Sequence, residues 1–129
     1  MIVDDSLMAS LLEKARASER LRANFDLRNS GEDGSQRMLN AIMPGSVVPI
    51  HRHRASSESV VCLKGALAEI IYDDSGKEQE RYELNADGPV RMCVIPKGAW
   101  HTVEVTEECV IFESKDGAFA PLSPDDILG

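Results

Sequence analysis

Short segments rich in β-branched, aliphatic and aromatic residues follow one another from residue 36 to residue 114. Turn signals such as Pro44-Gly45 and Asp73-Asp74-Ser75-Gly76 separate them. Roughly eight short strands at this spacing are typical of a sandwich or barrel, and a jelly roll is a common way to close such a set. We therefore expect a mainly β, jelly-roll barrel with strands at Gln36–Met43, Val47–His53, Glu58–Lys64, Ala66–Tyr72, Lys77–Leu84, Val90–Ile95, His101–Val105 and Cys109–Ser114.

One amphipathic helix is expected before the strands. Apolar residues recur at helical spacing within Asp4–Arg20, and acidic residues stand at its start, as the helix dipole prefers. A chain of 129 residues fits one structural domain. We expect three parts within it: a helix and loop that pack on the barrel (1–35), the β-barrel (36–116) and a tail that wraps the surface (117–129).

Composition and charge exclude several classes of function. The net charge of −8 would repel a nucleic-acid backbone, and no basic helix offsets it. No apolar run approaches the roughly 20 residues of a membrane span, and the first residues lack the features of a secretory signal, so we expect a cytoplasmic protein. Three cysteines at unpatterned spacing fit reduced thiols there: Cys62, Cys93 and Cys109.

Two histidines and a carboxylate form the first part of a candidate metal site. His51 and His53 lie two residues apart in an extended segment, so their side chains project from the same side of a strand. Glu58 follows a short polar loop and shares its strand face with apolar Val60 and Cys62. A carboxylate aligned with apolar neighbours is costly unless it is paired or metal-bound, which favours Glu58 as a ligand.

His101 is the fourth candidate ligand. A Pro96-Lys97-Gly98 turn precedes it, and it starts another β-rich run. Three imidazoles and one carboxylate suit Zn, Fe, Mn, Ni or Cu, and there is no pair of neighbouring cysteines to indicate a structural zinc site. We expect one divalent transition metal per chain, with Zn, Fe, Mn and Ni as the candidates.

The spacing of these residues resembles the two motifs of the cupin superfamily. The stretch from Gly45 to Gly65 matches the first motif, G-(X)5-H-X-H-(X)3,4-E-(X)6-G, at every position. The second motif, G-(X)5-P-X-G-(X)2-H-(X)3-N, is matched less closely, because Gly88 is too far from the proline and Val105 stands where asparagine is usual. The resemblance implies a cupin barrel with metal ligands at His51, His53, Glu58 and His101.

Most of the chain also resembles the small WbuC-type cupin metalloproteins. The segments that carry this resemblance are Arg22–Asn29, Gln36–Ala41 and Phe112–Gly117. That family is associated with bacterial lipopolysaccharide and O-antigen biosynthesis regions. The resemblance implies a fold, a metal and a context, and it implies no particular reaction.

Basic and amide side chains precede the acidic half of the chain and are candidates for ligand binding. Guanidinium groups bind carboxylates and phosphates in a bidentate fork, so an arginine beside a metal suits an anionic, oxygen-rich ligand. Such a ligand would be a carboxylate, a sugar acid or a phosphorylated sugar. We select Arg28, Arg37 and Asn40 as substrate-binding candidates.

Two classes of function remain open at this point. One is a metal-dependent enzyme, an isomerase, lyase or dioxygenase, for which the family resemblance implies a sugar or a sugar-derived acid as substrate. The other is a non-catalytic module that binds or senses a small ligand through its metal. A metal-independent sugar-nucleotide epimerase of related fold is disfavoured because all four ligands are present. The partner expected is a small molecule, and a homodimer is the default oligomeric state.

Overall fold

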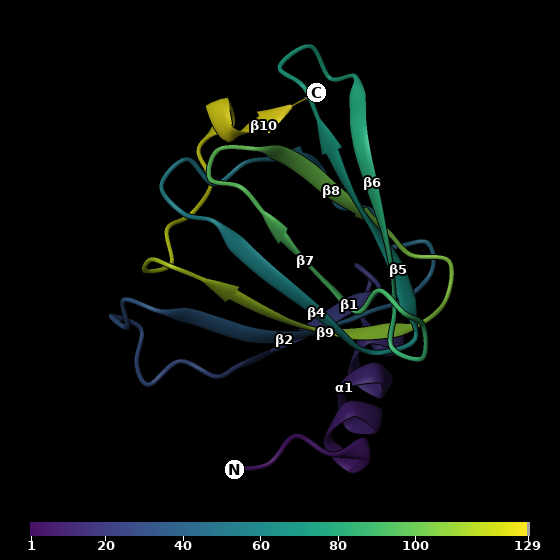
Figure 1. Cartoon of the computed structure of the whole chain (residues 1–129). Coiled ribbons are helices and arrows are strands. Elements are labelled where there is room, and N and C mark those ends of the chain that lie inside the picture. The colour runs from purple at the N-terminus through teal and green to yellow at the C-terminus, as the bar shows by residue number, and fades with distance from the viewer. Residues whose placement is uncertain (129) are drawn as a thin grey trace.

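Two antiparallel sheets of five strands each face one another in the computed structural model, which describes residues 1–128 (Figure 1). The first sheet has the strand order β1-β2-β9-β4-β7 and the second has the order β10-β3-β8-β5-β6. The elements are α1 (Asp5–Ala17), β1 (Arg22–Asp26), β2 (Gln36–Ile42), β3 (Ile50–His51), β4 (Glu58–Lys64), β5 (Ala66–Tyr72), β6 (Glu78–Asn85), β7 (Met92–Ile95), β8 (Trp100–Glu104), β9 (Cys109–Lys115), a 3-10 turn η1 (Pro124–Asp126) and β10 (Ile127–Leu128). The predicted fold class, a mainly β jelly roll in a single domain with an N-terminal helix, is confirmed.

Each predicted strand overlaps an observed one, but β3 is much shorter than predicted. Only Ile50 and His51 belong to it, because side chains take up the backbone carbonyls that precede it. Arg22 Nη1 donates to the carbonyl of Val47 at 2.8 Å, and Thr102 Oγ1 donates to that of Val48 at 2.6 Å. Pro49 has no backbone N–H to add to a ladder.

Two strands, β1 and β10, were not predicted. The β1 sequence alternates polar residues with only Ala23 and Phe25, and it becomes a strand by pairing with β2, from Arg22 opposite Ile42 to Asp26 opposite Met38. The first sheet therefore begins at residue 22, inside the segment that was expected to hold only the helix and a loop. Strand β10 pairs with β3, with Ile127 opposite His51.

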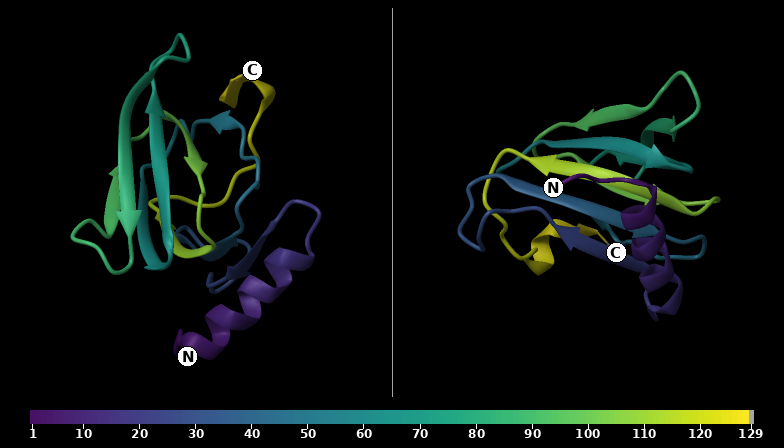
Figure 2. Two further views of the ribbon diagram at one scale, coloured as in Figure 1. Left: turned by 90° about the vertical axis from the view of Figure 1, so that its right-hand side faces the viewer. Right: turned by 90° about the horizontal axis from the view of Figure 1, so that it is seen from below.

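The helix α1 lies across the outer face of the first sheet (Figures 1 and 2). Asp4 Oδ1 accepts a hydrogen bond from the backbone N–H of Leu7 at 2.9 Å and so caps the helix. The helix ends at Ala17, three residues earlier than predicted. Its buried side chains pack on strands β2 and β9 in a cluster of Met8, Leu11, Leu12, Ala15, Leu39, Ala41 and Val110. No helix within residues 1–128 is long and apolar enough to cross a membrane.

A second cluster fills one end of the space between the sheets, and this leaves the other end to polar side chains. The cluster contains Ile42, Val60, Cys62, Leu67, Leu84, Ile95, Val105, Cys109 and Ile111. Because side chains alternate along a strand, Glu113 and Lys115 follow Cys109 and Ile111 on the inward face of β9. Glu58 likewise precedes Val60 and Cys62 on the inward face of β4. The polar end of the barrel is therefore built from the same strands as its core.

Candidate metal centre

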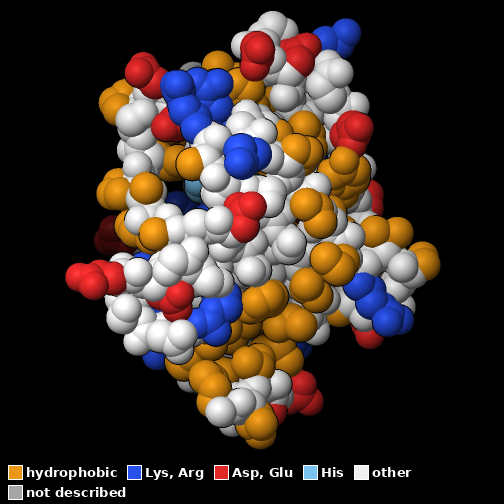
Figure 3. Space-filling model, turned by 60° about the vertical axis from the view of Figure 1, so that its left-hand side comes forward, with side chains coloured by type: hydrophobic (Ala, Val, Ile, Leu, Met, Phe, Trp, Pro, Cys, Tyr) orange, Lys and Arg blue, Asp and Glu red, His pale blue; other side chains and the backbone are white. Residues whose placement is uncertain are grey.

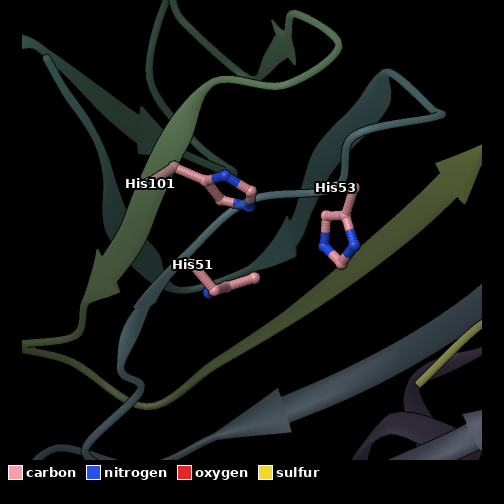
Figure 4. Close-up of side chains that lie close together, drawn as sticks. All are labelled: His51, His53 and His101. Carbon is pink, nitrogen blue, oxygen red and sulfur yellow. The ribbon is translucent and has the colours of Figure 1, made fainter. Parts of the chain in front are cut away.

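Three histidines meet at the polar end of the barrel. His51 on β3 lies directly opposite His101 on β8, and His53 follows β3 two residues later. One ring nitrogen from each residue lies within 4.8 Å of the others, and Figure 4 shows the three rings converging. The ring centroids of His51 and His101 are 4.3 Å apart. Three histidines this close together could bind a metal ion.

Hydrogen bonds hold two of the imidazoles in the tautomer that a metal needs. His51 Nδ1 donates to the carbonyl of Pro49 at 2.8 Å, and His101 Nδ1 donates to that of Ala99 at 2.9 Å. A carbonyl only accepts, so Nδ1 carries the proton and the lone pair is on Nε2. Burial lowers the pKa of His51 to about 4 and that of His53 to about 3, so both rings are neutral at pH 7.

The Glu58 carboxylate lies against the same nitrogens. Its Oε2 atom is 3.3 Å from His101 Nε2 and 3.7 Å from His53 Nε2, and the residue is only 5% exposed. This buried oxygen has no hydrogen-bond partner among residues 1–128. Two lone pairs face each other between Glu58 Oε2 and His101 Nε2, which is unfavourable unless a cation lies between them. The donor set of three imidazoles and one carboxylate therefore fits a divalent transition metal.

The histidines and Glu58 open into a cavity of about 340 Å³. A histidine side chain is visible inside a hollow on the face drawn in Figure 3. Both sheets contribute to the wall, together with the segment before β1 and the C-terminal tail. Its lining comprises Arg20, Arg22, Asn40, Ile42, Val48, Pro49, His51, His53, Glu58, Glu69, His101, Val103, Glu113, Lys115 and Leu122.

Of the three predicted substrate-binding residues, only Asn40 lines this cavity. Its Nδ2 donates to Glu113 Oε1 at 2.7 Å. Arg28 and Arg37 are not among the described lining residues, so their selection is not supported by where they lie. Arg28 pairs with Asp26 at 2.7 Å, and Arg37 pairs with Asp33 at 3.1 Å. An acidic residue close in the sequence is within reach of each of these arginines and binds it in place.

The cavity is also lined by charged residues that were not selected from the sequence. Arg22 lines the cavity but is not one of the residues selected from the sequence, in which β1 was not predicted as a strand. Lys115 is partly buried and has no ion-pair or hydrogen-bond partner for its side chain within residues 1–128. Strand alternation on β9 could have identified Lys115 and Glu113, since both continue the inward face of Ile111. Glu69 could have been identified in the same way as Glu58, because it is the only carboxylate in an otherwise apolar strand.

The pKa of Glu113 is raised to about 8 by burial and by the neighbouring Glu58 carboxylate. The acid form of Glu113 is therefore favoured at neutral pH. Its hydrogen bond from Asn40 ties this carboxyl group to the adjacent strand β2. Glu113 thus has a partner inside the barrel, unlike Glu58 Oε2.

The C-terminal tail is attached to the strand that carries His51. The Asp126 carboxylate accepts hydrogen bonds from Arg54 Nε at 2.6 Å and from Arg52 Nε at 3.2 Å, and the Arg54 guanidinium is the main cause that lowers the pKa of Asp126 to about 2. Leu122 lines the metal-site cavity and also a second cavity of about 520 Å³ between the tail and the segment after β3. His53 and Lys115 line both cavities as well, so the two adjoin.

Solved structures of cupin-fold proteins are similar to this chain. The capsular polysaccharide assembling protein CapF from Staphylococcus aureus superposes with a TM-score of 0.67 and 21% identity, over 84% of this chain and 31% of CapF. A cupin-2 domain protein from Shewanella frigidimarina superposes with a TM-score of 0.54 and 24% identity, over 71% of this chain and 78% of that protein. At these identities the likeness shows the fold alone.

An oxalate oxidase in complex with the substrate analogue glycolate superposes with a TM-score of 0.63 and 25% identity. The superposition covers 90% of this chain and 62% of the oxidase, so this chain spans less than two thirds of that protein. These neighbours confirm the cupin fold that the two motifs predicted.

The sequence comparisons give the family. No curated protein matches the chain significantly. The model of a family described as a domain of unknown function (DUF6016) matches residues 3–84, which include α1, the two histidines of the first motif and Glu58. The chain therefore belongs to the DUF6016 family.

Proposed function

We propose that this chain is a small cupin metalloprotein that binds one divalent transition metal, with Zn, Fe, Mn and Ni as candidates, and uses it to bind an anionic, oxygen-rich small molecule. The ligands in this proposal are His51, His53, His101 and Glu58. The observation that carries it is the unpartnered Glu58 Oε2 atom, 3.3 Å from His101 Nε2. A metal held there would polarise a carbonyl or hydroxyl oxygen of the bound molecule.

The basic side chains around the cavity support an anionic ligand. Lys115 lies beside His53 and opposite Glu58, and none of the described carboxylates forms an ion pair with its ammonium group. Arg22 is half-buried in the same wall. The local field near a ligand depends on these nearby cations more than on the net charge of −8, because salt screens distant surface charges.

Two of the similar structures support one class of anion within this proposal. The oxalate oxidase neighbour was solved with glycolate, a small hydroxy acid, and CapF is a capsular polysaccharide assembling protein. The resemblance to WbuC-type proteins points in the same direction, toward lipopolysaccharide or another surface polysaccharide. We therefore favour a sugar acid or a related carboxylate, and metal-assisted isomerase, lyase or dioxygenase chemistry on it. The alternative is binding without turnover.

Metal analysis and ligand titration test the proposal. Protein purified without a histidine tag should contain about one metal per chain, and His53→Ala should contain much less. Glycolate, galacturonate and glucose 1-phosphate should bind the metal-loaded protein more tightly than neutral glucose. The Lys115→Ala substitution should lower the affinity for these anions by about tenfold. Lys77→Ala, an exposed lysine on the β5–β6 turn, is the matched control.

Three outcomes separate the alternatives. Product formation that is lost in Glu58→Gln supports an enzyme, whereas saturable binding without chemical change supports a binding module. Equal binding of glucose and the anions, with no effect of Lys115→Ala, would contradict an anionic ligand. The homodimer expected from the sequence remains a prediction, and sedimentation velocity checks it.

A further inference from the structure

Glu69 is a carboxyl group inside the barrel that the metal site does not use. It lies on β5 between Leu67 and Ile71, whose side chains belong to the interior cluster or pack against it. Ile71 is directly opposite His101, and Glu69 is opposite Val103, the next inward residue of β8. Glu69 therefore projects into the interior beside the histidine site, and it lines the same cavity.

The side chain of Glu69 lacks the partners that a structural carboxylate has. The residue is 1% exposed, and its Oε2 atom has no hydrogen-bond partner within residues 1–128. Structural carboxylates of this protein are paired, as Asp126 is with Arg54 and Arg52. A buried polar atom without a partner destabilises the fold, because it has lost its hydrogen bonds to water. The Oε2 atom of Glu69 thus makes no hydrogen bond within residues 1–128 that would stabilise the ligand-free barrel.

The other polar side chains in the interior part of the cavity have identified roles or partners. The three histidines and Glu58 face one another, and Asn40 donates to Glu113. This leaves the Glu69 carboxyl group as an unpaired hydrogen-bonding site on the cavity wall. A bound molecule with a hydroxyl group could satisfy it, because an ionised carboxylate accepts from a hydroxyl and a neutral carboxyl group donates to one.

We infer that Glu69 is a specificity-determining residue that hydrogen-bonds a hydroxyl group of the ligand. This inference rests on the proposed function, since it concerns the molecule whose anionic end is bound at the metal and Lys115. It names the substrate class as polyhydroxy acids, which carry a carboxylate at one end and further hydroxyl groups along the chain. Simple hydroxy acids without those further groups would leave Glu69 unpaired and would bind more weakly.

Pairs of acids that differ only in the further hydroxyl groups test this inference. The probes are glycerate against lactate, threonate against 2-hydroxybutyrate, and gluconate against 2-hydroxyhexanoate. Both members of a pair offer the same carboxylate and 2-hydroxyl to the metal, so any difference arises elsewhere in the cavity. Calorimetric titration of the metal-loaded full chain should give about tenfold tighter binding of the polyhydroxy member in at least one pair, as one good hydrogen bond provides.

Variants of Glu69 then assign that preference to this side chain. The Glu69→Leu substitution should reduce the preference for the polyhydroxy member to less than about threefold, and it should not lower the affinity for the simple hydroxy acid. Glu69→Gln keeps a donor and an acceptor in the same shape, so it should retain part of the preference. Glu83→Gln, an exposed residue on β6, is the matched control and should behave as the wild type.

Stability measurements distinguish this role from a structural one. The ligand-free Glu69→Leu protein should melt at the same temperature as the wild type or higher, because the change removes a buried group without a partner. Equal binding within every pair, or an unchanged preference in Glu69→Leu, would overturn the inference and leave the proposed function standing. If neither member of any pair binds, the inference and the anionic-ligand proposal both fail.

Discussion

At the scale of single residues, the environment of Glu58 differs from that of Glu113. Its Oε2 atom is buried against two imidazole nitrogens and has no partner among residues 1–128. Glu113, on the neighbouring strand, accepts from Asn40 instead. Neutral imidazoles cannot stabilise a carboxylate by charge, so this oxygen is favourable only when a cation is bound.

Glu58→Gln should therefore have opposite effects on the loaded and the metal-free protein. Metal affinity should fall at least tenfold, because an amide oxygen is a weaker ligand than a carboxylate. The metal-free variant should be as stable as metal-free wild type or up to about 1–2 kcal/mol more stable, because an amide N–H in place of the unpartnered Oε2 atom can donate to the imidazole nitrogen that faces it. Thermal melts with and without chelator measure both effects. A metal-free variant that is clearly less stable would show that Glu58 has a structural partner.

The lowered histidine pKa values predict how the metal responds to acid. Protons compete with the metal for the same Nε2 atoms, but only below the pKa of each ring. Since burial lowers these values to about 4 for His51 and about 3 for His53, acid should not displace the metal at pH values near 6. The apparent affinity should stay nearly constant from about pH 7.5 to about pH 5.5 and fall below that range. Metal content after dialysis at each pH checks this, with circular dichroism to confirm that the protein stays folded. A tenfold loss near pH 6 would indicate histidines with ordinary pKa values near 6.5.

At the scale of elements, the tight turn between β4 and β5 depends on Gly65. The backbone there has φ of +75°, and a Cβ atom at this position would lie 2.0 Å from the carbonyl oxygen of Glu108. The next strand carries Glu69, and β4 carries Glu58. This close approach explains why the first motif ends with glycine.

Gly65→Ala should destabilise the protein by about 2–4 kcal/mol, because both the positive φ and the contact with Glu108 become strained. Gly34→Ala is the matched control, since a Cβ atom there meets nothing within 4 Å. Chemical denaturation of both variants measures the difference. Similar midpoints for the two variants would mean that the turn can relax around the new methyl group.

The C-terminal tail binds to β3 and to the segment that follows it, which carries His53. Asp126 holds Arg52 and Arg54, which flank His53, and β10 pairs with β3. Asp126→Asn removes the charge that binds both arginines, so the tail should detach more often. Limited proteolysis should then cut residues 117–123 several-fold faster than in the wild type. Asp125→Asn, next in the chain and exposed, should leave the rate unchanged.

At the scale of the whole molecule, the proposed metal ligands come from elements that only the folded barrel brings together. His51 and His53 belong to the β3 segment, Glu58 to the opposite sheet and His101 to β8. The unfolded chain has no such site, so we expect metal binding at these residues to be thermodynamically coupled to folding.

Metal at 100 times its dissociation constant should add about 2.7 kcal/mol to the free energy of unfolding. For a domain of this size, that corresponds to a rise of roughly 10 °C in melting temperature. Scanning calorimetry of loaded and chelated protein measures the shift, and His53→Ala should show little of it. An equal melting temperature in the two states of demonstrably loaded wild type would contradict the coupling.

The sequence by itself determined the fold class and indicated four candidate metal ligands, because both depend on patterns of residues along the chain. Strand alternation placed His51 and His53 on one side, and turn residues bounded eight strands. The resemblance to the cupin motifs then indicated Glu58 and His101 as further candidate ligands. Each of these features is indicated by residues that lie close together in the chain.

The tertiary structure alone decided which charged residues line the cavity. Arg28 and Arg37 are as basic as Arg22 and Lys115, yet nearby aspartates bind the first two outside the cavity. Lys115 lines the cavity because β9 pairs with β4. This pairing puts Lys115 opposite Glu58, although the two residues are 57 positions apart in the sequence. Glu69 and Glu58 occur on strands of different sheets, and only the closure of the barrel places both on one cavity wall. Ion pairing and strand order act between residues that are far apart in the chain, and no local pattern contains them.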